Sequence, residues 1–150
     1  MKRLMIAASV GATLAFATPV FAMTDAECTA LWTKADVNKN GVVTEAEGAR
    51  YFATLRIANK PVADGKLTQP MFIEHCKAGH FESAKLDPAA PLPGSNSFTE
   101  AQAIDRVLAA GLGSVSALKK DADGVWRGTA SDGAKTVSVA VDFKGNVVAR

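Results

Sequence analysis

Side chains that carry oxygen recur at fixed intervals in the twelve-residue stretch from Asp36 to Glu47. A calcium ion takes six to eight oxygen ligands, and a loop of this length between two helices can supply them. Counting from Asp36, side-chain oxygens fall at positions 1, 3, 5, 9 and 12, and Gly41 at position 6 permits a sharp turn. With the carbonyl at position 7, a water held at position 9 and both oxygens at position 12, the stretch offers seven ligands. The candidate calcium ligands are Asp36, Asn38, Asn40, Val42, Thr44 and Glu47.

This stretch resembles the calcium-binding loop of the EF-hand family. The resemblance rests on Gly41 at position 6, the aliphatic Val43 at position 8 and Glu47 at position 12. It implies a Ca2+ ion held between two helices. Only Asp36 and Glu47 are acidic, and Lys39 adds an opposing charge, so we expect weak binding, with a dissociation constant of about 10⁻⁴ to 10⁻³ M. A turn that binds no ion is the alternative.

A second stretch, residues 60–71, fits the same frame, with glycine at position 6 and leucine at position 8. The ligand positions 1, 3 and 12 are occupied by Lys60, Val62 and Met71. Because none of these side chains binds calcium, the stretch resembles a degenerate second hand with a structural role. Leu67 is expected to face Val43 in a short strand pairing between the two loops. A second ion held mostly by backbone carbonyls is the alternative.

Three helices are predicted around these loops. Thr24 with Glu27, and Thr44 with Glu47, have the capping-box spacing that starts a helix, and a third helix is expected after Thr68. Apolar side chains then recur at the spacing that places them on one helix face. These positions are Cys28, Leu31, Trp32 and Ala35; Gly48, Tyr51, Phe52 and Leu55; and Met71, Phe72, His75 and Cys76.

Residues 1–22 have the layout of a secretory signal peptide. Lys2 and Arg3 precede an apolar stretch that is too short to span a bilayer comfortably, and small residues precede a cleavage site after Ala22. An uncleaved membrane anchor is the alternative. Signal cleavage predicts a periplasmic or secreted protein with no stable membrane anchor.

The charge balance argues against a nucleic-acid partner. The chain has 17 basic and 15 acidic residues, and removing Lys2 and Arg3 leaves 15 of each. The excess positive charge therefore belongs to the export signal and does not indicate a nucleic-acid surface.

Cys28 and Cys76 are the two cysteines of the chain. Export places them in an oxidising compartment, so we expect a disulfide between the first and third helices. The alternative is a transition-metal site formed by His75, Cys76 and His80. Gly79 is expected to end the helix before His80, which favours solvent-facing histidines beside a disulfide.

Residues 85–97 separate two unlike patterns. Three prolines and a glycine in this segment predict a semi-extended linker between residues 23–84 and 98–150. The last part predicts one helix, starting near Thr99 and ended by glycines, and then three or four antiparallel strands. The helix should bury Ala101, Ile104, Val107 and Leu108, and a strand should bury Val137, Val139, Val141 and Phe143, with Thr136, Ser138, Ala140 and Asp142 opposite. The expected turns are Asp123-Gly124, Asp132-Gly133 and Lys144-Gly145.

The segments FTEAQA, GVWRGTA and VSVAVDFKGNVV in residues 98–150 resemble the PepSY-like class of small exported modules. That resemblance implies an α+β fold and a role in protein–protein regulation, including peptidase inhibition, and it carries no catalytic residue. Trp126 can pack over the helix beside Ile104 and Leu108, which we prefer, or serve as an exposed anchor for a partner.

The predicted fold is therefore an all-α half, an EF-hand pair at residues 23–84, followed by a small α+β module. We expect a non-enzymatic, exported calcium-binding protein, with calcium in a structural or weak sensing role and a second module that contacts a protein partner. The alternative is a periplasmic peptidase inhibitor or regulator in which calcium only stabilises the N-terminal half. An enzyme is the least favoured class, because no nucleophile, phosphate loop or acid–base pair has a recognisable setting.

Overall fold

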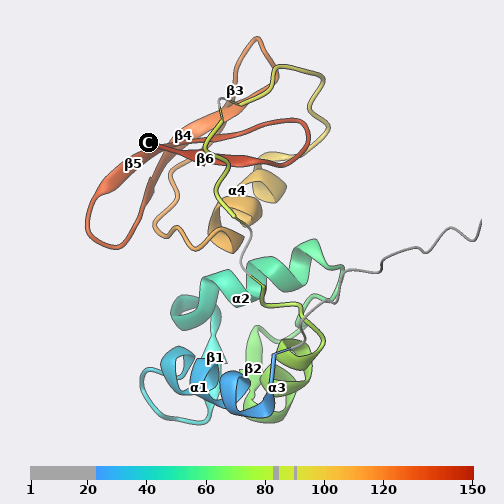
Figure 1. Ribbon diagram of the computed structural model, residues 1–150, viewed down its shortest axis with the longest axis vertical. Coiled ribbons are helices and arrows are strands. Elements are labelled where there is room, and N and C mark those ends of the chain that lie inside the picture. Colours follow the sequence, from blue (N-terminus) through green and yellow to red (C-terminus); the bar gives the residue numbers. More distant parts are fainter. Residues whose placement is uncertain (1–22, 83–84, 90) are drawn as a thin grey trace, which may run out of the picture.

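A computed structural model describes residues 23–82, 85–89 and 91–150. They form four helices and two small antiparallel sheets, arranged as two halves along the long axis of the molecule (Figure 1). The predicted signal peptide, residues 1–22, lies outside the described residues. In the part of the chain that is described, no helix is both long and apolar enough to cross a membrane.

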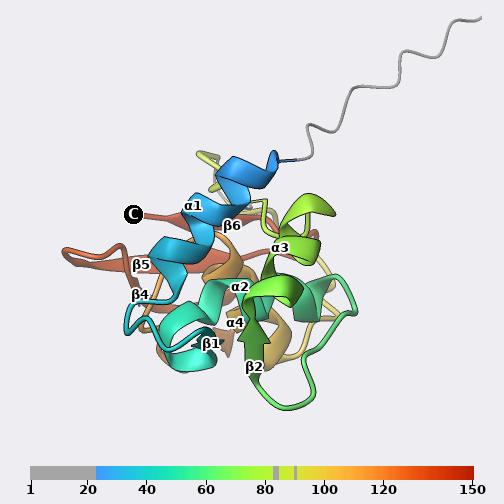
Figure 2. The ribbon, with the colours of Figure 1, turned by 90° about the horizontal axis from the view of Figure 1, so that it is seen from below.

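The N-terminal half consists of three helices and a two-stranded sheet. Its elements are α1 (Asp25–Ala35), β1 (Val42–Thr44), α2 (Glu45–Ile57), β2 (Lys66–Thr68) and α3 (Gln69–Lys77). The predicted capping box starts α1, where Thr24 accepts from the backbone N–H of Glu27 and the Glu27 carboxylate accepts from Thr24. Strands β1 and β2 pair antiparallel with Val43 opposite Leu67, which confirms the predicted pairing. Figure 2 shows α1 and α3 side by side.

The core of this half is aromatic and is closed by the predicted disulfide. Cys28 and Cys76 are bonded, with their Cα atoms 5.8 Å apart, and both are fully buried. Three of the rings that pack against one another, with centroids 4.6 to 4.9 Å apart, belong to Tyr51, Phe72 and Phe81. The predicted helix faces are confirmed except at three positions: Leu31 and His75 are only half-buried, and Met71 is exposed.

Gly48 lies inside α2 at a point where the backbone leaves helical geometry, with φ −128° and ψ 37°. A Cβ atom on this residue would lie 2.6 Å from Val43 Cγ1 and 3.1 Å from Tyr51 Cδ2. We expect Gly48→Ala to lower the free energy of unfolding by about 1–3 kcal/mol through overpacking, measured by urea denaturation. Gly113→Ala is the control, since no atom lies within 4 Å of its added Cβ. Equal stability of the two variants would contradict the expectation.

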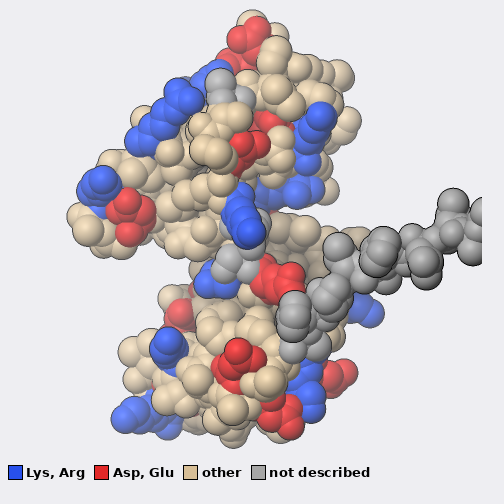
Figure 3. Space-filling view, in the orientation of Figure 1, with Lys and Arg blue, Asp and Glu red and all other residues tan. Residues whose placement is uncertain are grey.

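The C-terminal half, the upper part of the molecule in Figures 1 and 3, is one helix packed on a four-stranded antiparallel sheet. The helix is α4 (Glu100–Ala109), and the strands are β3 (Lys119–Lys120), β4 (Trp126–Ser131), β5 (Thr136–Val141) and β6 (Val147–Ala149). The strands follow the chain order across the sheet, and the three predicted turns connect them. The predicted Thr99 cap of α4 is also confirmed, with its oxygen 3.2 Å from the backbone nitrogen of Gln102.

The core of this half lies between α4 and the sheet, but the predicted helix face is partly wrong. Buried alanines, Ala103 and Ala109, lie beside Val107, whereas Ala101 is exposed and Leu108 is half-buried. On β5 the buried residues include Val137, Val139 and Val141.

Of two aromatic residues in this half, Trp126 lies where the sequence analysis predicted and Phe143 does not. Trp126 packs against the core and donates from Nε1 to the carbonyl of Phe98 at 3.1 Å, so the preferred interpretation holds. Phe143 lies beyond the end of β5, and its ring packs against Gly94 instead of lying with the core residues of that strand.

The described residues of segment 85–97 lie along the C-terminal half. The backbone N–H of Asp87 donates to the carbonyl of Val147 at 2.7 Å, and that of Gly94 donates to Asp123 at 2.9 Å. Asn96 is buried and donates to the carbonyl of Val141 at 3.4 Å. These contacts fix the segment to the sheet, while its role as a domain boundary stays a prediction.

Candidate metal site

The loop from Asp36 to Glu47 connects α1 to α2, and both of its ends are held by helix termini. The backbone N–H of Asp36 donates to the carbonyl of Trp32 at 2.9 Å, which makes Asp36 the C-cap of α1. Thr44 is the N-cap of α2 and Glu47 lies in its first turn. Helix ends therefore position the first and last candidate ligands, and Asp36 is buried.

Hydrogen bonds inside the loop turn its side-chain oxygens toward its own backbone. Asp36 accepts at Oδ1 from the N–H of Asn40 and at Oδ2 from the N–H of Gly41, both at 3.0 Å. Asn38 Oδ1 accepts from the same Asn40 amide at 3.0 Å, and Asn40 Oδ1 accepts from Val42 at 2.9 Å. The chain doubles back at Gly41, whose φ of 82° favours glycine. Three candidate ligand side chains thus share one turn.

Glu47 is the last residue of the loop, and only one of its two carboxylate oxygens accepts hydrogen bonds. Its Oε2 accepts from the N–H and the hydroxyl of Thr44, at 3.1 and 2.8 Å. The pKa of Glu47 is lowered mainly by these bonds, first from the Thr44 backbone and then from its side chain, with a smaller contribution from the backbone of Asn38. The carboxylate is thus negative at neutral pH.

The second oxygen of this carboxylate is the most informative atom of the site. Glu47 Oε1 is buried and has no hydrogen-bond partner among the described residues. A buried charged oxygen without a partner is costly, and such atoms in folded proteins usually have a ligand, a water or a functional reason. A cation within the loop would satisfy it, and the remaining oxygen donors of the loop are of the type that calcium prefers.

The predicted degenerate loop lies beside the first one. Gly65 has a φ of 63°, so this chain also doubles back at position 6. Asp64 accepts from the N–H of Lys66 at 3.3 Å, and Met71 lies in α3, where it is exposed. Across the sheet, Leu67 and Val43 are both fully buried. The shared strand pair thus joins the candidate loop to a partner loop without side-chain ligands at its first, third and last positions.

The alternative transition-metal site of His75, Cys76 and His80 lacks a free thiol, because Cys76 is in the disulfide. His75 and His80 are partly buried, contrary to the solvent-facing prediction, and their Nδ1 atoms are 3.1 Å apart. No group of three or more His, Cys, Asp or Glu side chains that could hold a metal occurs in the described ranges. Of those residue types the candidate loop has only Asp36 and Glu47 among its ligands, since its other donors are amide, hydroxyl and carbonyl oxygens.

No family model, curated protein or solved structure matches the chain.

Sequence reasoning missed the ion-pair cluster that ties the loop's outgoing helix to the other half. Arg56 on α2 donates from Nε to both carboxylate oxygens of Asp105 on α4, at 2.9 and 3.0 Å, and from Nη2 at 2.6 Å. Its Nη1 donates to Glu45 at 2.7 Å, beside the candidate site. The hydrogen bonds that Arg56 donates to the Asp105 carboxylate are the main cause that raises the pKa of Arg56. Arg56 and Asp105 are 49 positions apart, so no local pattern connects them.

Proposed function

We propose that this protein is an exported, non-enzymatic calcium-binding protein. Residues 23–84 act as an EF-hand pair with one functional and one degenerate loop, and the C-terminal half contacts another protein. The observation that carries the calcium assignment is the buried, unpartnered Oε1 of Glu47 at the closing position of an oxygen-rich loop.

The ligands of the ion would be Asp36, Asn38, Asn40, Val42, Thr44 and Glu47. The ion would neutralise two carboxylates and hold the end of α1 against the start of α2, which is a stabilising role. Two acidic ligands give a low charge count, and Lys39 opposes the ion, so the expected affinity is about 10⁻⁴ to 10⁻³ M. A large sensor-type opening is not expected with one functional loop and a disulfide between the outer helices.

Calcium is expected to raise the melting temperature of the oxidised protein. At a calcium concentration ten times the dissociation constant, the linkage relation predicts an increase of about 4–8 °C for a domain of this size. Glu47→Gln should abolish most of the increase, because the amide removes the charge and one of the two oxygens that face the ion. The measurement is thermal unfolding by circular dichroism in a calcium series and in excess chelator.

Glu45→Gln is the matched control. This substitution also removes one negative charge, two positions before Glu47. The Glu45 side chain is exposed and is not a candidate ligand, so the variant should keep the calcium-dependent increase in melting temperature. Absence of any shift at millimolar calcium would show that the loop does not bind the ion. An equal loss of the shift in both variants would indicate that calcium responds to general negative charge and has no defined site.

A further inference from the structure

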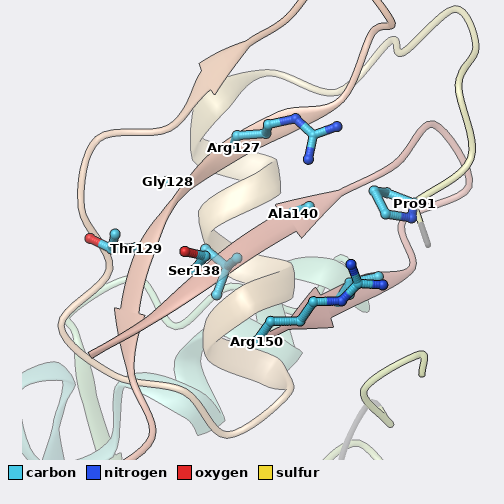
Figure 4. A pocket seen from close by; sticks show the side chains of 9 residues that line it. Pro91, Arg127, Gly128, Thr129, Ser138, Ala140 and Arg150 are labelled. Atoms are coloured by element: carbon cyan, nitrogen blue, oxygen red, sulfur yellow. The ribbon is translucent and has the colours of Figure 1, made fainter. Parts of the chain in front are cut away.

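The face of the sheet that α4 leaves uncovered carries a groove with a volume of about 490 Å³ (Figure 4). Its floor is formed by β4, β5 and β6, and Pro91 from the segment before α4 forms one wall. We call it the open-face groove. The residues that define it are Pro91, Arg127, Thr129, Ser138, Ala140 and Arg150.

Strand register brings these side chains to one face. Arg127 is opposite Ala140, and Thr129 is opposite Ser138, and residues opposite each other in a sheet share a face. Ser138 also exchanges backbone hydrogen bonds with Arg150, at 2.8 and 3.0 Å. Arg127 on β4 and Arg150, which directly follows β6, thus flank β5 on the side away from α4.

The two arginines lie where they can act on one ligand. Figure 4 shows their side chains on either side of Ala140, both extending toward Pro91. Arg127 is half-exposed and donates from Nε to Asp121 at 2.5 Å, which leaves its terminal nitrogens for another acceptor. In the described residues, Arg150 takes part in no ion pair. Guanidinium groups favour carboxylates because their paired donors match two oxygens.

Apart from the two arginines, the groove is lined by apolar side chains and by two hydroxyl groups. Ala140 and Val148 are buried and form, with Val125, a small apolar cluster that is distinct from the core under α4. Thr129 and Ser138 present exposed hydroxyl groups farther along the groove. A ligand that suits all three features has carboxylates at one end, a short apolar contact and polar groups that accept or donate hydrogen bonds. An extended peptide has this composition.

We propose that the open-face groove binds an acidic peptide segment of a partner protein, whose Asp or Glu carboxylates pair with Arg127 and Arg150. This inference rests on the proposed function, since it names the chemistry of the partner for the C-terminal half. A nucleic acid suits the groove less well, because its binding depends on many phosphate contacts or on aromatic stacking. The groove offers two arginines and no aromatic side chain among its lining residues.

The test is fluorescence anisotropy of the purified protein with a short labelled peptide of alternating Glu and Ala. The same peptide with Gln in place of Glu is the uncharged control. Arg127→Gln with Arg150→Gln is expected to weaken binding of the Glu peptide by at least about tenfold, because two charge-assisted interactions are lost. Ser138→Glu should weaken it similarly by adding a like charge, whereas Ser138→Gln should not. Lys34→Gln on α1 removes a positive charge outside the groove and should leave the affinity unchanged.

Several outcomes would overturn the proposal: equal binding of the Gln peptide, an affinity unaffected by the arginine changes, or the same loss with Lys34→Gln. Stronger arginine-dependent binding of a single-stranded oligonucleotide would replace the peptide with a nucleic acid. Displacement of the peptide by free glutarate at a similar concentration would replace it with a small dicarboxylate. A calcium-dependent melting shift that persists while peptide binding fails would leave the calcium assignment standing and remove only this inference.

Discussion

Replacing both Cys28 and Cys76 with alanine is expected to lower the free energy of unfolding by about 4 kcal/mol. The bond joins residues 48 positions apart, and a cross-link of this span removes much of the conformational freedom of the unfolded chain. Both side chains are fully buried, so alanine leaves no unpaired hydroxyl group as serine would. The measurement is urea denaturation of the oxidised protein and of the double variant.

Reduction of the unmodified protein provides the control, since it removes the bond and keeps both sulfur atoms. A similar loss of stability on reduction and in the double variant would assign the effect to the cross-link. A loss of less than about 1 kcal/mol in both cases would mean that the unfolded chain already keeps α1 near α3. The calcium-dependent increase in melting temperature should survive in the double variant, because neither cysteine belongs to the loop.

Helix starts, loop glycines and turns could be predicted from the sequence because each depends on neighbours in the chain. The Thr24–Glu27 and Thr99–Gln102 caps each join residues three positions apart, and the turn at Gly41 needs a φ that favours glycine. The pairing of Cys28 with Cys76 followed from there being two cysteines in an expected oxidising compartment. Local signals sufficed for these features.

The burial of Phe81 could not be predicted from neighbouring residues in the sequence. This residue follows the end of α3 and belongs to no periodic helix face, yet it is buried against Tyr51 and Phe72. The left-handed turn at Gly79 sends the chain back over the core, and the burial of Phe81 depends on where that turn points. Tertiary packing decided its position, as it decided the contact between Arg56 and Asp105.

The alternation of side chains along β5 was predicted correctly, but the burial of the side that faces away from α4 was not. Ser138 is exposed as expected, but Ala140 and Asp142 on the same side of the alternation are buried. Contacts of segment 85–97 with this half explain the difference, because Leu92 in that segment donates its N–H to Asp142 at 3.3 Å. A segment predicted as a linker supplies part of the covering layer, and its prolines gave no sign of that contact.

Asp142→Asn is expected to lower the free energy of unfolding by about 2–3 kcal/mol, because buried N–H donors lose their acceptor. The carboxylate is almost fully buried. Its Oδ1 accepts from the backbone of Lys144 and Asn146, at 2.9 and 3.0 Å, and its Oδ2 accepts from the Asn146 side chain at 3.0 Å and from Leu92. An asparagine has one acceptor oxygen, so its amide group would face at least one of these donors. Urea denaturation at neutral pH measures the change.

The same carboxylate should make stability depend on pH in acid. Burial raises the pKa of Asp142, but the hydrogen bonds from Asn146 and from the Leu92 and Lys144 backbones together outweigh it and leave the pKa below its usual value. The unfolded chain therefore takes up the proton first as pH falls, so the stabilisation is complete above the ordinary Asp pKa of about 3.9 and is lost as pH falls through the folded-state pKa.

Protonated Asp142 and the amide of Asp142→Asn present a similar donor to the same partners. The difference in unfolding free energy between the two proteins should consequently be largest above about pH 5 and should shrink as pH falls below about 4. Glu27, Glu47 and Asp121, whose pKa values are also lowered by hydrogen bonds, titrate in both proteins and cancel in the difference. A difference that stays constant down to the acid unfolding of the protein would show that the charge of Asp142 contributes nothing and that its shape alone holds the turn.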